Sequence, residues 1–114
     1  HREEVWRDLV DLKGIFCKQL PEMGEEYVTK VVFDHRHRSI LVKRNGAVCG
    51  GVCFRPFAAQ GFAEIVFCAI THDHKFKGYG TRLMNHLKEW CRQEGMYHLL
   101  TCADNNAVGY FKKA

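Results

Sequence analysis

The first part of the chain carries apolar residues at helical spacing. Over residues 3–18 they fall on one stripe: Val5, Leu9, Leu12 and Phe16. A stripe of this period predicts an amphipathic helix that packs on a core. Pro21 and Gly24 end it, and a second short helix is expected over Glu25–Phe33.

A hairpin is predicted next, because apolar runs over residues 39–44 and 47–54 flank the dipeptide Asn45-Gly46. Asn-Gly is the favoured pair for a two-residue type I′ turn, since both positions require positive φ. We expect the second strand to end or bend at Pro56, because proline cannot donate to a β-ladder.

The second half of the chain reads as strand, helix, strand. Residues 62–70 form a nearly continuous apolar run, typical of a central strand that is covered on both faces. An amphipathic helix follows and ends near Gly95, and residues 97–102 form another short apolar strand, which indicates a parallel crossover. With a last helix over residues 105–113, the order predicts one α/β domain spanning residues 1–114, a mixed sheet flanked by helices.

Composition agrees with a small globular domain, because 46% of the 114 residues are hydrophobic. The net charge of +4 is spread along the chain and is weak evidence for nucleic acid. The six cysteines have no zinc-site spacing, so we interpret them as reduced core thiols of an intracellular protein and expect no metal. No apolar stretch reaches 18 residues, so no membrane segment is expected.

A candidate anion site lies between the central strand and the helix that follows it, in Lys75-Phe76-Lys77-Gly78-Tyr79-Gly80-Thr81. Glycine allows a ligand to approach the backbone closely, and a helix N-terminus presents unpaired N–H groups. The spacing differs from the loops that bind NAD or ATP. Taken alone, the segment fits a plain tight turn as well as a pyrophosphate site.

Two further residues carry candidate chemistry. Glu64 is the single charge in the apolar strand, and an apolar environment suits a carboxylate acting as general base near neutral pH. The alternative is a strand-end glutamate paired with a base such as Arg55. Strand alternation puts Glu64 and Cys68 on one face, about 13 Å apart. Tyr110 carries a phenol able to donate a proton, whereas Phe111 is expected in the core.

Together these features resemble the GNAT superfamily, and within it the Gcn/PCAF-type histone lysine acetyltransferases. Similarity covers nearly the whole chain, with its most specific segments at residues 62–70, 77–89 and 109–113. The resemblance implies the GNAT fold, truncated at both ends: the chain starts after the family's first strand and stops before its last helix and strands are complete.

The resemblance also implies a role for each site residue. Glu64 matches the general base, and Tyr110 matches a tyrosine close to the sulfur. The cofactor-binding matches are Cys68, Ala69 and Ile70 for the pantetheine arm, through backbone groups; Lys75, Phe76, Lys77, Gly78, Tyr79, Gly80 and Thr81 for the pyrophosphate; and Asn106 and Ala107 near the cofactor. Lys75 stands where glutamine or arginine is usual, and Asn105-Asn106 replaces a more common acidic–aromatic pair.

The implied function is transfer of acetyl from acetyl-CoA, without a metal, to a lysine of a histone N-terminal tail by direct attack in a ternary complex. The implied setting is nuclear, in a multi-subunit coactivator complex that activates transcription, with no direct contact to nucleic acid or membrane. Three alternatives stay open: an enzyme with Cys68 as acyl-accepting nucleophile, a non-catalytic acyl-CoA-binding module, and a small-amine N-acetyltransferase.

Overall fold

The fold is a four-stranded mixed sheet between helices, seen in a computed structural model that describes residues 2–71 and 78–101. Its elements are α1 (Arg2–Gln19), η1 (Pro21–Met23), α2 (Glu25–Val32), β1 (Arg38–Arg44), β2 (Ala47–Phe57), η2 (Ala58–Gln60), β3 (Phe62–Ile70), α3 (Tyr79–Gln93) and β4 (His98–Thr101). This confirms the expected α/β order and the parallel pairing of β3 with β4. The helix expected over 105–113 lies outside the described residues.

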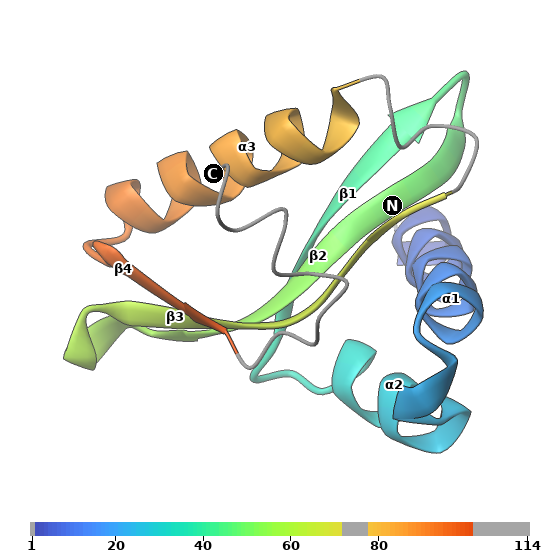
Figure 1. Ribbon diagram of the computed structural model, residues 1–114, viewed down its shortest axis with the longest axis horizontal. Coiled ribbons are helices and arrows are strands. Elements are labelled where there is room, and N and C mark those ends of the chain that lie inside the picture. The colour runs from blue at the N-terminus through green and yellow to red at the C-terminus, as the bar shows by residue number, and fades with distance from the viewer. Residues whose placement is uncertain (1, 72–77, 102–114) are drawn as a thin grey trace.

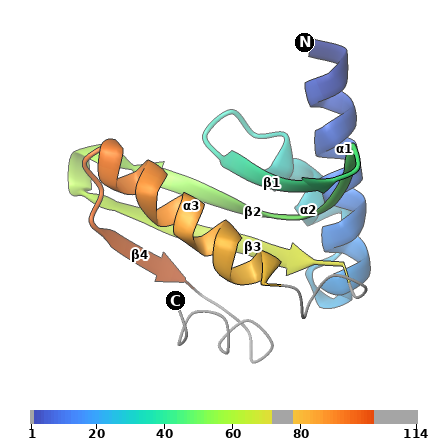
Figure 2. The same cartoon turned by 90° about the horizontal axis from the view of Figure 1, so that it is seen from above.

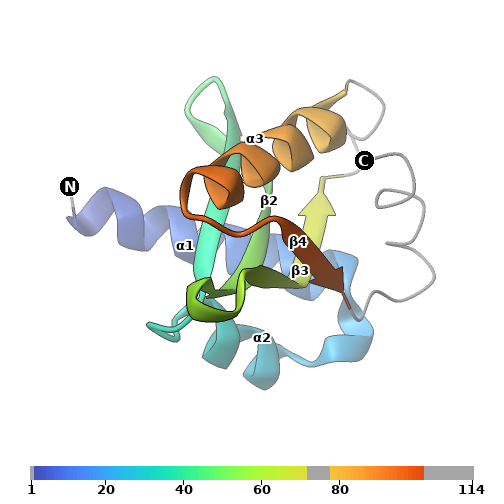
Figure 3. The same cartoon turned by 90° about the vertical axis from the view of Figure 1, so that its left-hand side faces the viewer.

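The sheet has the strand order β1-β2-β3-β4 and separates two apolar cores. Helix α3 covers one face, whereas α1 and α2 cover the other (Figure 1). Seen from above, α3 runs across the sheet in front of β2 and β3 (Figure 2). The side view shows α1 passing behind the strands (Figure 3). No helix in the described ranges is both long and apolar enough to cross a bilayer.

Side chains from opposite sides of β3 fill the two cores, as the apolar run predicted. The α3 side holds Val52, Phe54, Ala63, Ile65, Ile70, Leu83, Met84, Leu87, Cys91 and Met96. The α1–α2 side holds Leu12, Phe16, Leu20, Val28, Val31, Val32, Cys53, Phe67 and Ala69. Burial of these side chains on both faces makes β3 the central strand of the domain.

The β1–β2 hairpin has the predicted turn, with Asn45 at φ 53° and Gly46 at φ 82°. Strand β2 was expected to end or bend at Pro56; it ends one residue later, at Phe57, and Pro56 still pairs with Ala63. Strand β1 reaches only as far as Phe54, so the last residues of β2 have no strand on that side within the described part of the chain. An edge position tolerates a proline because no ladder bond is lost there.

Strand β3 contains a β-bulge that interrupts its alternation. Cys53 pairs with Phe67 and Phe54 pairs with Ile65, so Val66 is an extra residue in β3. Ile65 therefore packs in the core under α3, while Val66 and Phe67 both pack on the α1–α2 side. The prediction that Glu64 and Cys68 share one face is thus wrong, because strand alternation holds only without an inserted residue.

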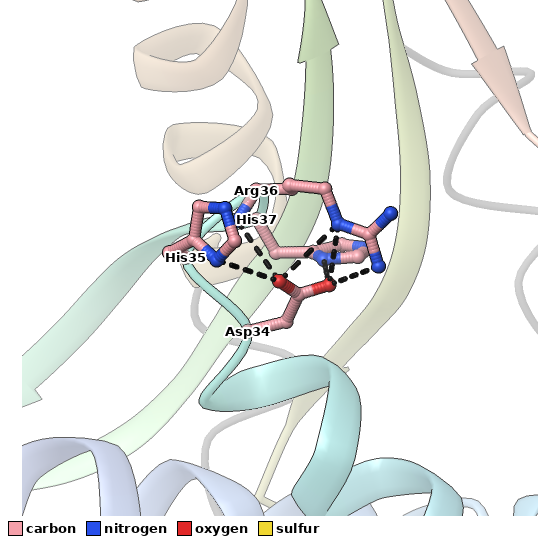
Figure 4. A network of polar contacts seen from close by, with 4 residues as sticks. All are labelled: Asp34, His35, Arg36 and His37. Carbon is pink, nitrogen blue, oxygen red and sulfur yellow. Dashed lines mark hydrogen bonds and ion pairs between the residues drawn. The ribbon is translucent and has the colours of Figure 1, made fainter.

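The turn between α2 and β1 is organised by one carboxylate, Asp34 (Figure 4). It accepts the backbone N–H of Arg36 at 3.1 Å and the Arg36 guanidinium at 2.9 Å. The ring Nδ1 of His37 lies 3.2 Å away, and that of His35 lies 3.4 Å away. The hydrogen bonds from Arg36 hold the pKa of Asp34 well below its usual range.

Replacing Asp34 with asparagine should therefore give a pH-dependent loss of stability. A lowered folded-state pKa stabilises the fold above the unfolded pKa of about 3.9, and this contribution disappears as the pH falls below it. We expect the urea midpoints of wild type and Asp34→Asn to differ most at pH 6–7 and to converge toward pH 2. Asp11→Asn, at an exposed position of α1, is the control, and an equal gap at pH 6 and pH 2 would contradict this role.

Candidate functional site

One edge of β3 is open over the second half of the strand. Strand β4 pairs with residues 62–65 of β3 and ends at Thr101, opposite Ile65. Within the described residues, no strand lies beside residues 66–70 on that edge. The separation of β3 and β4 therefore leaves backbone groups of β3 available to a ligand.

The hydrogen-bond alternation along β2 and β3 shows which backbone groups face this open edge. The Thr71 N–H donates to the Cys49 C=O at 2.7 Å, which fixes the alternation of hydrogen-bonded and non-hydrogen-bonded pairs. Cys68, opposite Val52, and Ile70, opposite Gly50, fall in non-hydrogen-bonded pairs. Their N–H and C=O groups point away from β2 and toward the open edge.

Ala69 lies between these two residues and behaves differently. It faces Gly51 in a hydrogen-bonded pair, so its N–H and C=O point toward β2. Two of the three backbone positions predicted for the pantetheine arm therefore face outward, and the third holds the strand in the sheet.

The open edge of β3 leads toward the N-terminus of α3 (Figure 1). Gly78 is the N-cap and has φ 78°, a conformation that other residues rarely adopt. No side chain caps this end, and the first turn contains no acidic residue. Gly80 is buried, Thr81 is exposed, and the Arg82 guanidinium lies 5.8 Å from the centre of the Tyr79 ring. A helix start of this kind favours an anionic ligand.

Glu64 is half-buried and lies close to the point where β3 and β4 separate. Its register partners are Arg55 in β2 and Leu100 in β4. It forms no hydrogen bond or ion pair with any residue in the described ranges. The Arg55 guanidinium lies instead over the Phe57 ring, 4.6 Å from its centre. The alternative of a Glu64–Arg55 ion pair is therefore not what the structure contains.

The thiol of Cys68 is a poor nucleophile in this environment. Burial raises its pKa to about 12. A raised pKa keeps the thiol in its protonated form near neutral pH, whereas the thiolate is the nucleophilic form. Cys68 is also unpaired, as are the other described cysteines, Cys17, Cys49, Cys53 and Cys91. These observations disfavour an acyl-cysteine mechanism.

Not every predicted site residue can be placed. Among the predicted residues that are described, Glu64 lies near the start of β3, Cys68, Ala69 and Ile70 lie at its end, and Gly78, Tyr79, Gly80 and Thr81 form the start of α3. Lys75, Phe76, Lys77, Asn106, Ala107 and Tyr110 lie outside the described residues. In the ranges that are described, no three His, Cys, Asp or Glu side chains are grouped so that they could hold a metal ion.

Sequence reasoning missed the surroundings of Glu64. The stacking of Arg55 on Phe57 was readable in part, because residues two apart in a strand share a face. The bulge at Val66 left no signal, because the residues around it are uniformly apolar.

These features of fold and site agree with a sequence-family match over residues 3–114, and the chain belongs to the acetyltransferase (GNAT) family. It is 56% identical over 110 residues to the histone acetyltransferase GCN5 of Oryza sativa subsp. japonica, covering 96% of this chain and 21% of the rice protein. It is 51% identical over 107 residues to that of Debaryomyces hansenii, covering 92% of this chain and 24% of the yeast protein. The chain thus spans about a quarter or less of the length of these relatives.

Solved structures support the same assignment. Tetrahymena GCN5 matches with a TM-score of 0.89 and 50% identity, covering 92% of this chain and 66% of that one. The catalytic domain of Tetrahymena GCN5 in complex with coenzyme A matches with a TM-score of 0.80 and 48% identity, covering 96% and 67%. A ribosomal-protein-alanine N-acetyltransferase from Brucella melitensis, at 17% identity and a TM-score of 0.74 over 95% and 82% of the two chains, shares the fold alone.

Proposed function

We propose that this chain is the catalytic core of a histone lysine N-acetyltransferase that uses acetyl-CoA. The observation that carries the proposal is the open β3 edge, on which Cys68 and Ile70 turn backbone groups outward, leading to the uncapped N-terminus of α3. The relatives named histone acetyltransferase GCN5 supply the substrate class. On the same basis we infer that the protein acts on chromatin in the nucleus, within a multi-subunit coactivator complex.

The donor set fits acetyl-CoA. The outward N–H and C=O groups of Cys68 and Ile70 suit the amide-containing pantetheine arm. The N-terminus of α3 and the segment 75–81 suit the pyrophosphate, because free N–H groups and positive charge favour anions there. Ala69 anchors the strand to β2 rather than binding the ligand with its N–H. When bound, acetyl-CoA supplies an acetyl group already activated as a thioester.

Glu64 is proposed to act as general base. A free lysine has a pKa near 10.4, so only about one amine in 2,500 is neutral at pH 7. The Glu64 carboxylate, unpaired within the described residues, accepts the ammonium proton, through a water where the distance requires one. The freed amine then attacks the thioester carbon.

The Cys68 N–H is proposed to stabilise the charge that develops on the carbonyl oxygen, an effect worth roughly 3–4 kcal/mol at such sites. Collapse then breaks the carbon–sulfur bond and expels the thiolate. Tyr110 is proposed as the donor that protonates it. The acetyl group passes from sulfur to nitrogen. The first lysine proton passes to Glu64, and the second, lost from the nitrogen after attack, is proposed to replace through solvent the proton that Tyr110 gives to the thiolate.

Calorimetric titration with coenzyme A and mass spectrometry of histone tails incubated with acetyl-CoA would test the proposal. Acetylated tail lysines together with coenzyme A binding support it. Binding without transfer to tails or amines would indicate an acyl-CoA-binding module. Transfer to a small polyamine but not to tails would indicate a small-amine N-acetyltransferase.

Replacing Cys68 with alanine should leave turnover within about threefold of wild type, because the proposed contact uses the backbone N–H and burial raises the pKa of the thiol. Steady-state kinetics would check this, with Cys49→Ala as the control for loss of a buried thiol. Loss of activity by more than 100-fold in Cys68→Ala, with folding intact by circular dichroism, would instead support a covalent acyl-cysteine.

A further inference from the structure

Three side chains surround Glu64 on its face of the sheet and form a patch with it: Arg55, Phe57 and Phe62. In the antiparallel register, Arg55 lies opposite Glu64, and Phe57 lies opposite Phe62. Residues directly opposite, and residues two apart in a strand, share a face. The patch therefore places one cation and two aromatic rings around the proposed base.

Arg55 is within reach of Glu64 but does not contact it. Directly opposite residues have Cβ atoms about 4.5–5.5 Å apart, which long side chains bridge easily. The guanidinium lies over the Phe57 ring instead, 4.6 Å from its centre. That ring is itself stacked on Phe62, with centroids 4.7 Å apart and planes inclined by 19°. Cation–π contacts and exposed ion pairs are of similar strength, so the supported ring can decide where the arginine rests.

We propose that the Phe57–Phe62 stack holds the Arg55 guanidinium away from Glu64 and so keeps the Glu64 carboxylate basic. Arg55, Phe57 and Phe62 are then positioning residues, acting on the reaction only through Glu64. This inference rests on the proposed role of Glu64 as base. A guanidinium beside the carboxylate would stabilise its ionised form, and a weaker base removes the lysine proton less efficiently.

Other charged side chains lie near this face of the sheet. From β4, His98 pairs with Phe62 and so lies diagonal to Glu64. From the helices on this side, Lys13 is paired with Glu25 at 3.1 Å, and from α1 Asp8 is paired with Lys43 at 2.7 Å. The remaining charged side chains of the α1 C-terminal half and of α2 are exposed: Asp11, Lys18, Glu26 and Lys30. Arg55 is therefore the cation that lies directly opposite Glu64.

The test is a carbon-detected NMR titration of the Glu64 side-chain carboxyl in the full 114-residue chain, which requires no turnover. Phe57→Ala should move the Glu64 titration midpoint down by about half a pH unit, the size expected for a new partly exposed ion pair. Phe57→Leu should do the same, and Phe57→Tyr should not. The double variant Phe57→Ala/Arg55→Gln should return the midpoint to its wild-type value.

If the Phe57 variants do not fold, the Glu64 titration midpoint of Arg55→Gln alone still tests the proposal. Its midpoint should equal that of wild type, because the arginine does not contact Glu64; an upward shift would overturn the proposal. An unchanged midpoint in folded Phe57→Ala and Phe57→Leu would overturn it too. His98→Gln, measured alongside, controls for the neighbouring titratable ring.

Failure of this inference is distinguishable from failure of the proposed function. If Glu64→Gln keeps wild-type turnover, the role of Glu64 as base is wrong whatever the NMR shows. If Glu64→Gln is inactive and the Phe57 variants leave the Glu64 titration midpoint unchanged, the result supports Glu64 as the base and contradicts the positioning role of Phe57. The two results come from separate measurements on separate variants.

Discussion

Turnover near neutral pH should fall by about 10²–10⁴-fold when Glu64 is replaced by glutamine, the usual contribution of a general base. Glutamine keeps the size of the side chain and cannot accept the proton. Affinity for coenzyme A should stay within about threefold, because Glu64 lies before the bulge and the proposed cofactor contacts lie beyond it. Steady-state kinetics on a histone-tail peptide and calorimetry with coenzyme A would measure the two effects.

Glu89→Gln provides the matched control for that experiment. Glu89 is exposed on α3 and is ion-paired with Arg92, so the same chemical change occurs away from the site. Its turnover should match that of wild type. Wild-type turnover in Glu64→Gln would remove Glu64 from the mechanism, whereas loss of both turnover and coenzyme A binding would indicate a structural role.

Replacing Gly50 with alanine should destabilise the fold by about 1–3 kcal/mol, a typical cost of overpacking. A Cβ on Gly50 would lie 2.5 Å from the Ala69 carbonyl oxygen and 2.8 Å from the Ile70 Cα, and backbone atoms cannot move aside cheaply. The strain falls on the end of β3 that carries the proposed cofactor contacts. We therefore expect a lower urea midpoint together with weaker coenzyme A binding.

Gly14→Ala is the control, with the opposite expected sign. Gly14 lies within α1, and a Cβ there would meet no atom within 4 Å. Alanine is favoured over glycine inside a helix by about 0.5–1 kcal/mol, so the urea midpoint should rise. Equal midpoints for Gly50→Ala and wild type would show that β2 and β3 can separate at no cost.

Much of the fold follows from local pattern. Asn45-Gly46 dictates its turn because few other dipeptides adopt two positive φ values. The apolar run 62–70 marks the central strand, because only a strand covered on both faces leaves so little polar surface. The likeness to a known family predicted the fold, and the start of a helix at Gly78-Tyr79-Gly80 agrees with the glycines there.

The candidate site was predicted less completely, for an identifiable reason. Residue types point to Glu64 as a base, and the family resemblance implies a backbone role for residues 68–70. They do not say which backbone groups are free, because this depends on the hydrogen-bond pattern with β2 and on where β4 stops. Cys68 turns its backbone groups outward and Ala69 turns them toward β2 because of how β2 and β3 pair, not because of the type of either residue.

By itself, the sequence determined the order of elements, the hairpin turn, the central strand and the residue types of the site, since these depend on period, φ preference and side-chain chemistry. Only the tertiary structure decided that a bulge forms at Val66 and that β2 continues one residue past Pro56. It also decided that the Arg55 guanidinium lies over the Phe57 ring. Each of these depends on which neighbouring strand is present and in what register. A pairing between residues distant in sequence cannot be read from either partner alone.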